Sequence, residues 1–69
     1  MDKNKLLYFI KDRGYKVEDF LIKLDMSKGK FYRRCNNISF SIREIWEIAK
    51  LLNLTVEEIN SIFIVDFVS

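Results

Sequence analysis

The 69 residues suffice for one small domain, and a hydrophobic content of 49% with 14% aromatics is typical of a globular protein and not of a disordered chain. A single cysteine excludes an internal disulfide, and without any histidine it leaves no recognisable zinc-ligand set. The net charge of +2 is unevenly distributed: residues 1–37 hold ten Lys/Arg and five Asp/Glu, a net +5, whereas residues 38–69 hold two and five, a net −3. A polyanion would therefore bind the first part of the chain.

Two short helices are predicted first, over about residues 3–13 and 17–24. Asp2 or Asn4 can cap the first helix, because a side-chain oxygen can accept from a free amide of the first turn, and Gly14 can supply a left-handed end. Apolar residues recur in both segments at the spacing of one helix face. These residues are Leu6, Leu7 and Ile10 in the first helix, and Phe20, Leu21 and Leu24 in the second.

The third predicted helix, over about residues 27–36, is basic. Ser27 can cap its start, and Phe31 with Cys35 forms a narrow apolar stripe for packing on a core. Gly29 in its first turn costs about 1 kcal/mol relative to alanine. The helix carries four cations within two turns and no acid: Lys28, Lys30, Arg33 and Arg34. One apolar edge and one cationic edge are what a helix needs to lie in a DNA major groove.

Two further helices are predicted over about residues 41–52 and 55–63. Each begins with the spacing of a capping box, Ser41 with Glu44 and Thr55 with Glu58. Before them, two consecutive asparagines favour a loop over residues 36–40. The inward faces are expected to be Ile42, Ile45, Trp46, Ala49 and Leu52, and then Val56, Ile59, Ile62 and Phe63. Five short helices with short connections predict a compact all-α domain.

Aromatic residues and the end of the chain complete the expected core. Phe40 and Trp46 have core spacing, and aromatics in so small a domain are expected to be buried. The tail over residues 64–69 is apolar, and Ile64–Val68 has the β-propensity of a short strand. Such a tail can fold back on its own domain or pair with another chain, and a two-fold dimer would cover it.

Little in the sequence indicates catalysis, a cofactor or a membrane. The acidic pairs Glu18–Asp19 and Glu57–Glu58 fall in helix first turns, where they stabilise the helix dipole, and no glycine-rich phosphate loop is present. No apolar run approaches the ~20 residues of a membrane span, and Met1–Lys5 lacks the apolar stretch of a secretion signal. We expect a cytoplasmic protein that is not an enzyme.

Residues 3–63 resemble the helix-turn-helix domain of phage Cro and repressor proteins. The matching segments are Lys16–Leu21 for the second helix, Asp25–Ser27 for the turn, Lys28–Arg34 with Asn36–Asn37 for the recognition helix and its end, and Ile48–Glu58 for the closing part. The chain departs from the family pattern at Val17, where Gln is frequent, and at Leu21, where a small residue is usual. Asp25 replaces the turn glycine, and Arg34 occupies an often apolar position, which leaves the rotation of the recognition helix open by one residue.

The resemblance implies an all-α, five-helix fold of the lambda-repressor type and a small Cro-like repressor of a phage or prophage. Such a protein would bind double-stranded operator DNA as a homodimer in the nucleoid of a bacterial host and block a promoter sterically. Lys28 and Arg33 fall where the family reads base edges, and Gly29 falls at a third such position. The remaining DNA-contacting positions, mostly for phosphates, are Lys16, Val17 through its amide, Ser27, Lys30, Tyr32, Arg34, Asn36 and Arg43.

A protein-interaction module on the same scaffold is the alternative. In that interpretation the chain would act as an anti-repressor or a repressor partner. The apolar tail, or Tyr32 with Phe40, would then dock another protein.

Overall fold

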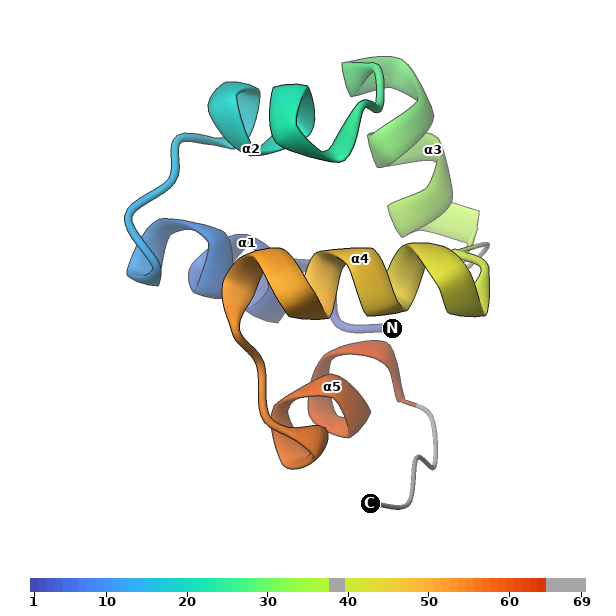
Figure 1. Ribbon diagram of the computed structural model, residues 1–69. Helices are drawn as coiled ribbons and strands as arrows, with labels where there is room; N and C mark the ends of the chain where they lie inside the picture. Colours follow the sequence, from blue (N-terminus) through green and yellow to red (C-terminus); the bar gives the residue numbers. More distant parts are fainter. Residues whose placement is uncertain (38–39, 65–69) are drawn as a thin grey trace.

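The computed structural model describes residues 1–37 and 40–64, which form five α-helices (Figure 1). Their bounds are α1 Lys3–Asp12, α2 Val17–Leu24, α3 Lys28–Asn37, α4 Ile42–Leu52 and α5 Val56–Phe63. The all-α prediction is confirmed, and every predicted helix is present to within a residue or so at each end. The predicted loop over residues 36–40 is wrong at its start, because Asn36 and Asn37 are helical. The tail strand predicted beyond Ile64 lies outside the described residues.

The helices are arranged around α4, which crosses the middle of the molecule with α2 on one side and α5 on the other (Figure 1). α1 packs on both α2 and α5. α3 stands at one end, near the start of α4, and its axis turns away from that of α2 (Figure 1). This arrangement leaves α3 at the periphery of the molecule.

Side-chain caps explain where the helices begin. An Asp2 oxygen accepts from the Lys5 amide at 3.0 Å, and the Ser27 hydroxyl accepts from the Lys30 amide at 3.2 Å. Both predicted capping boxes are formed in full. Local contacts between residues three apart therefore set these starts before any tertiary packing is considered.

Left-handed residues follow the ends of α1, α2, α4 and α5. Gly14 has φ +88°, which glycine adopts readily because it has no Cβ atom. Asp25 and Asn53 have φ +57° and +53°. Asp and Asn tolerate this region better than other side chains, because their short polar groups bond to the local backbone. Ile64 has φ +53° as well, a costly conformation for a β-branched residue.

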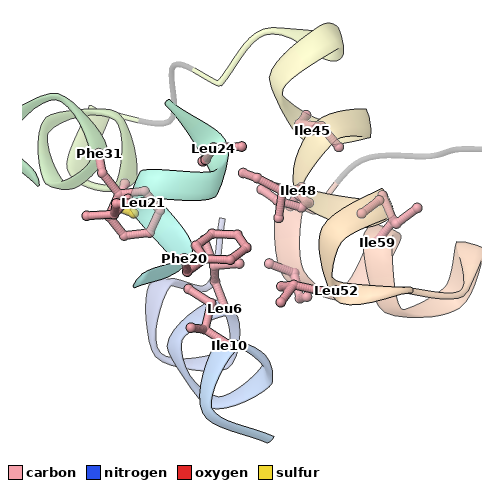
Figure 2. Packing of buried hydrophobic residues seen from close by; sticks show 14 residues of the cluster. Leu6, Ile10, Phe20, Leu21, Leu24, Phe31, Ile45, Ile48, Leu52 and Ile59 are labelled. Carbon is pink, nitrogen blue, oxygen red and sulfur yellow. The ribbon is translucent and has the colours of Figure 1, made fainter. Parts of the chain in front are cut away.

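One apolar cluster draws on all five helices (Figure 2). Phe20 of α2 lies at its centre, facing Leu6 from α1 and Leu52 from α4 (Figure 2). The buried set is Leu6, Ile10, Phe20, Leu21, Leu24, Phe31, Cys35, Ile45, Ile48, Ala49, Leu52, Ile59, Ile62 and Phe63. The predicted inward faces of α2 and α5 are confirmed, except that Val56, like Leu7 of α1, is only half-buried.

The predicted inward face of α4 is wrong at two residues. Ile42 is 65% exposed and Trp46 is 47% exposed, while Ile48, which the periodicity did not select, is buried. The face that packs is Ile45, Ile48, Ala49 and Leu52, with the i, i+3, i+4, i+7 spacing of a helix stripe. Ile42 and Trp46 lie along the edge of this stripe, so α2 and α5 do not cover them fully.

Phe40 is half-buried and joins two distant parts of the chain. Its ring centroid lies 5.9 Å from that of Phe31 in α3 and 5.9 Å from that of Phe63 in α5, both in edge-to-face geometry. Phe40 was expected to belong to the core. It packs against the core as expected, but it is only half-buried.

Arg13 ties the end of α1 to the connection between α4 and α5. Its Nε donates to the Leu52 carbonyl at 2.9 Å, and its Nη2 lies 3.1 Å from a Glu58 carboxylate oxygen. The Thr55 amide that donates to Glu58, and after it the Arg13 guanidinium, hold the pKa of Glu58 below its usual value, although burial acts in the opposite direction. Ionised Glu58 therefore contributes stability at pH values above its ordinary pKa.

We expect Glu58→Gln to lower the free energy of unfolding near neutral pH by up to about 1 kcal/mol. Since the folded-state pKa is depressed, this contribution is lost as the pH falls through it, so the variant and the wild type should converge in acid, once the pH lies below the folded-state pKa. Urea unfolding followed by circular dichroism at both pH values measures the difference. Glu57→Gln, at an exposed carboxylate of the same turn, is the matched control. Equal losses at both pH values would contradict the assignment.

Candidate nucleic-acid interface

The connection between α2 and α3 changes the direction of the chain within three residues. α2 ends at Leu24, and Asp25 adopts the left-handed conformation with φ +57° and ψ +46°. The Met26 amide then donates to the Leu21 carbonyl at 3.1 Å, and Ser27 caps α3. Asp25 thus supplies the left-handed end of α2, and the turn brings the basic helix out at an angle to α2.

Two buried side chains fix the rotation of α3 about its axis. Phe31 is fully buried and Cys35 is 5% exposed, so the apolar edge predicted from their spacing is confirmed. Gly29, Arg33 and Asn36, at i, i+4 and i+7, form a stripe on the opposite side, and all three are exposed. We call this stripe, with the exposed Lys28 and Lys30 on either side of it, the α3 face.

Burial raises the pKa of the Cys35 thiol above its ordinary value, although Lys3 acts weakly in the opposite direction. The thiol therefore stays protonated near neutral pH and serves as a small apolar group of the core.

Arg34 differs from the other three cations of α3. Its Nη1 lies 3.1 Å from a Glu44 carboxylate oxygen, and the two side chains are only 29% and 15% exposed. Glu44 also accepts from the Ser41 amide at 2.8 Å as part of its capping box. The ion pair therefore fastens α3 to the first turn of α4. No sequence signal indicated it, because the two residues are ten positions apart and Glu44 already had a local role.

The structure places the remaining predicted DNA-contact residues outside the α3 face, at positions that face α1, at the start of α2 and on α4. Tyr32 is half-buried, and the Lys3 ammonium lies 5.8 Å from its ring centroid, so Tyr32 faces α1. Lys16 is exposed at the start of α2 and has extended backbone, and no side chain caps the amides that begin there at Val17. Arg43 is 89% exposed, with its Nε 3.6 Å from Glu47. It neighbours Glu44 in sequence and so lies near the end of α3.

Metal-type clusters and membrane-spanning helices are both absent from the part of the chain that the structure describes. Within residues 1–37 and 40–64, no three His, Cys, Asp or Glu side chains are grouped as a metal site would need. None of the helices described there has the length and apolarity to cross a membrane.

Comparison with known proteins gave no relative: no protein-family model, curated protein or solved structure matches the chain. The function must therefore be inferred from the site itself.

Proposed function

We propose that the protein is a sequence-specific regulator that binds double-stranded DNA by placing the α3 face in the major groove. The observation that carries the proposal is a peripheral helix whose apolar edge and Arg34 are held by the domain, while Lys28, Lys30 and Arg33 point to solvent with no acid in the helix. The short α2, the three-residue turn and α3 support a helix-turn-helix arrangement of the Cro and repressor type.

Each part of the α3 face has a role that matches its chemistry. Arg33 can donate two hydrogen bonds to guanine O6 and N7, a contact worth about 1–3 kcal/mol of discrimination. Asn36 shares its stripe and can pair with adenine N6 and N7. Lys28 and Lys30 suit flanking bases or phosphates, and the exposed start of α2 at Lys16 suits a phosphate. The sites should therefore contain guanine in each half.

Binding to a palindromic operator as a dimer would explain how so small a surface selects a site. A single recognition helix buries too little to be selective, whereas two related helices can read half-sites about 34 Å apart. Occupation of an operator that overlaps a promoter would then block transcription sterically.

Selection of duplexes from a random pool, followed by anisotropy titration at two salt concentrations, tests the proposal. We expect enrichment of an inverted repeat and an affinity that falls steeply with salt, since phosphate contacts release counterions. Binding that is absent, or that selects no sequence, would reject it. The alternative, a protein-interaction module, predicts an interface that barely responds to salt. Its suggested surface of Tyr32 and Phe40 is half-buried in packing, which disfavours that version.

Gly29 offers a sharper test, because the described residues leave room for a side chain at this position. A Cβ added at Gly29 would meet no atom within 4 Å, and its φ is not in the left-handed region. We expect Gly29→Ala to stabilise the domain by up to about 1 kcal/mol, raising the melting temperature by a few degrees. The same variant should bind DNA more weakly if the helix backbone approaches the bases there. An unchanged affinity for the selected duplex would place Gly29 outside the contact.

A further inference from the structure

The edge of α4 carries two apolar side chains that are partly exposed to solvent among the described residues. Ile42 and Trp46 are one helical turn apart and are 65% and 47% exposed, although the neighbouring stripe of α4 is buried. Arg43 and Glu47 follow each of them by one residue, with exposed fractions of 89% and 48%. We call these four residues the α4 surface.

The order of residues on the α4 surface is self-complementary. If a second copy packs its α4 antiparallel to the first about a two-fold axis, Ile42 approaches Trp46 of that copy. The same operation brings Arg43 close to Glu47 of the second copy, and each contact occurs twice. The apolar contact between the two α4 helices is thereby flanked by two ion pairs. In one, Arg43 of the first copy meets Glu47 of the second, and in the other these roles are exchanged.

We propose that the α4 surface is where a second copy of this chain docks to form a two-fold dimer. The role of this dimer, which is to bind two half-sites, rests on the proposed function. Dimerisation through the α4 surface can be tested without DNA. The Arg34–Glu44 pair fixes α3 against the first turn of α4, so the α4 surface lies beside the end of α3.

The small area of the α4 surface limits the affinity expected for the dimer. Stable dimers bury about 800 Å² on each partner, and two apolar side chains with their neighbours supply only part of that area. The dimer in solution should therefore have a dissociation constant in the micromolar range or weaker, and two half-sites on one duplex would supply the effective concentration that completes it.

Sedimentation equilibrium of the full chain without DNA is the first test. We expect the wild type to shift from monomer to dimer as its concentration rises, and Ile42→Gln/Trp46→Gln to remain monomeric with an unchanged circular dichroism spectrum. Ile22→Gln/Tyr8→Gln is the matched control, because Ile22 and Tyr8 are 77% and 61% exposed on other helices, and it should dimerise like the wild type. A monomeric wild type, or a dimer that survives the α4 substitutions, would overturn the proposal.

A charge exchange tests the two-fold geometry itself and needs no change to the apolar residues. Arg43→Glu alone and Glu47→Arg alone should each weaken the homodimer, because like charges then meet across the axis. Mixed in equal amounts, these two variants should form a heterodimer, in which every cross-axis pair is again of opposite sign. Within each variant, positions 43 and 47 still carry the same charge and repel each other. Any gain in association on mixing must therefore come from contacts between the two chains. If the mixture associates no better than the separate variants, the antiparallel docking is wrong.

Binding to a single half-site separates this proposal from the proposed function. The monomeric Ile42→Gln/Trp46→Gln variant retains the α3 face and should bind a half-site duplex as well as the wild type does, while losing affinity for the full inverted repeat. Dimers that bind no duplex would reject the proposed function and leave the docking surface standing.

Discussion

Reversing the charges of Lys28 and Arg33 together should lower the affinity for duplex DNA by about 100-fold or more, since each lost contact is worth about 1–3 kcal/mol and each 1.4 kcal/mol is tenfold. Both side chains are exposed, so the Lys28→Glu/Arg33→Glu protein should keep its fold. The dependence of affinity on salt should also become shallower, because fewer counterions are released. Anisotropy titration at several salt concentrations measures both effects.

A control variant with the same change of charge distinguishes local contacts from a general electrostatic effect. Lys11→Glu/Lys23→Glu alters two exposed lysines that lie on α1 and α2 and do not belong to the α3 face. Its affinity should fall far less than that of the Lys28 and Arg33 variant. If both variants lose the same affinity, α3 has no special role in binding. If neither loses any, the assignment of the α3 face is wrong.

Phe31→Ala should remove most of the stability of the domain. The Phe31 side chain is fully buried, and its ring lies 5.4 Å from that of Tyr32 and 5.9 Å from that of Phe40. Truncating a buried phenylalanine costs about 3–5 kcal/mol, and a domain of this length has only about 3–10 kcal/mol in total. Thermal unfolding followed by circular dichroism should therefore show a transition tens of degrees lower, or none.

Phe31→Leu separates the loss of volume from the loss of the aromatic ring. Leucine fills most of the site, so this variant should lose about 1.5 kcal/mol or less and remain folded. A loss below about 0.5 kcal/mol in Phe31→Ala, within the range of ordinary surface changes, would mean that Phe31 does not anchor α3 to the core.

The helix boundaries were predictable because short-range chemistry sets them. Ser41 and Thr55 bond to residues three positions ahead, and Asp25 accepts a left-handed backbone without help from distant segments. The apolar edge of α3 was predictable for a similar reason, since only Phe31 and Cys35 could form it. Local sequence patterns therefore predict where a helix starts, where it ends and which of its sides is apolar.

The packing of α4 could not be obtained in this way. Its apolar residues allow two overlapping stripes, and the choice between Trp46 and Ile48 as the inward residue depends on the space left by α2 and α5. The Arg34–Glu44 pair likewise arises from tertiary structure, because the chain must first bring α3 to the start of α4. Asn36 was predicted as the last residue of the helix and the first of a loop, and its place on the exposed stripe follows only from the continuation of α3 through Asn37.

The Arg34–Glu44 ion pair has a consequence for the operators that such a dimer could accept. It joins α3 to the element that carries the α4 surface, so the reading helices and the dimer contact would move as one rigid unit. One inserted base pair between half-sites displaces the second half by about 3.4 Å and rotates it by roughly 34° about the duplex axis. A rigid pair of helices cannot follow that rotation. The spacing of the half-sites should therefore be as strictly specified as their sequence.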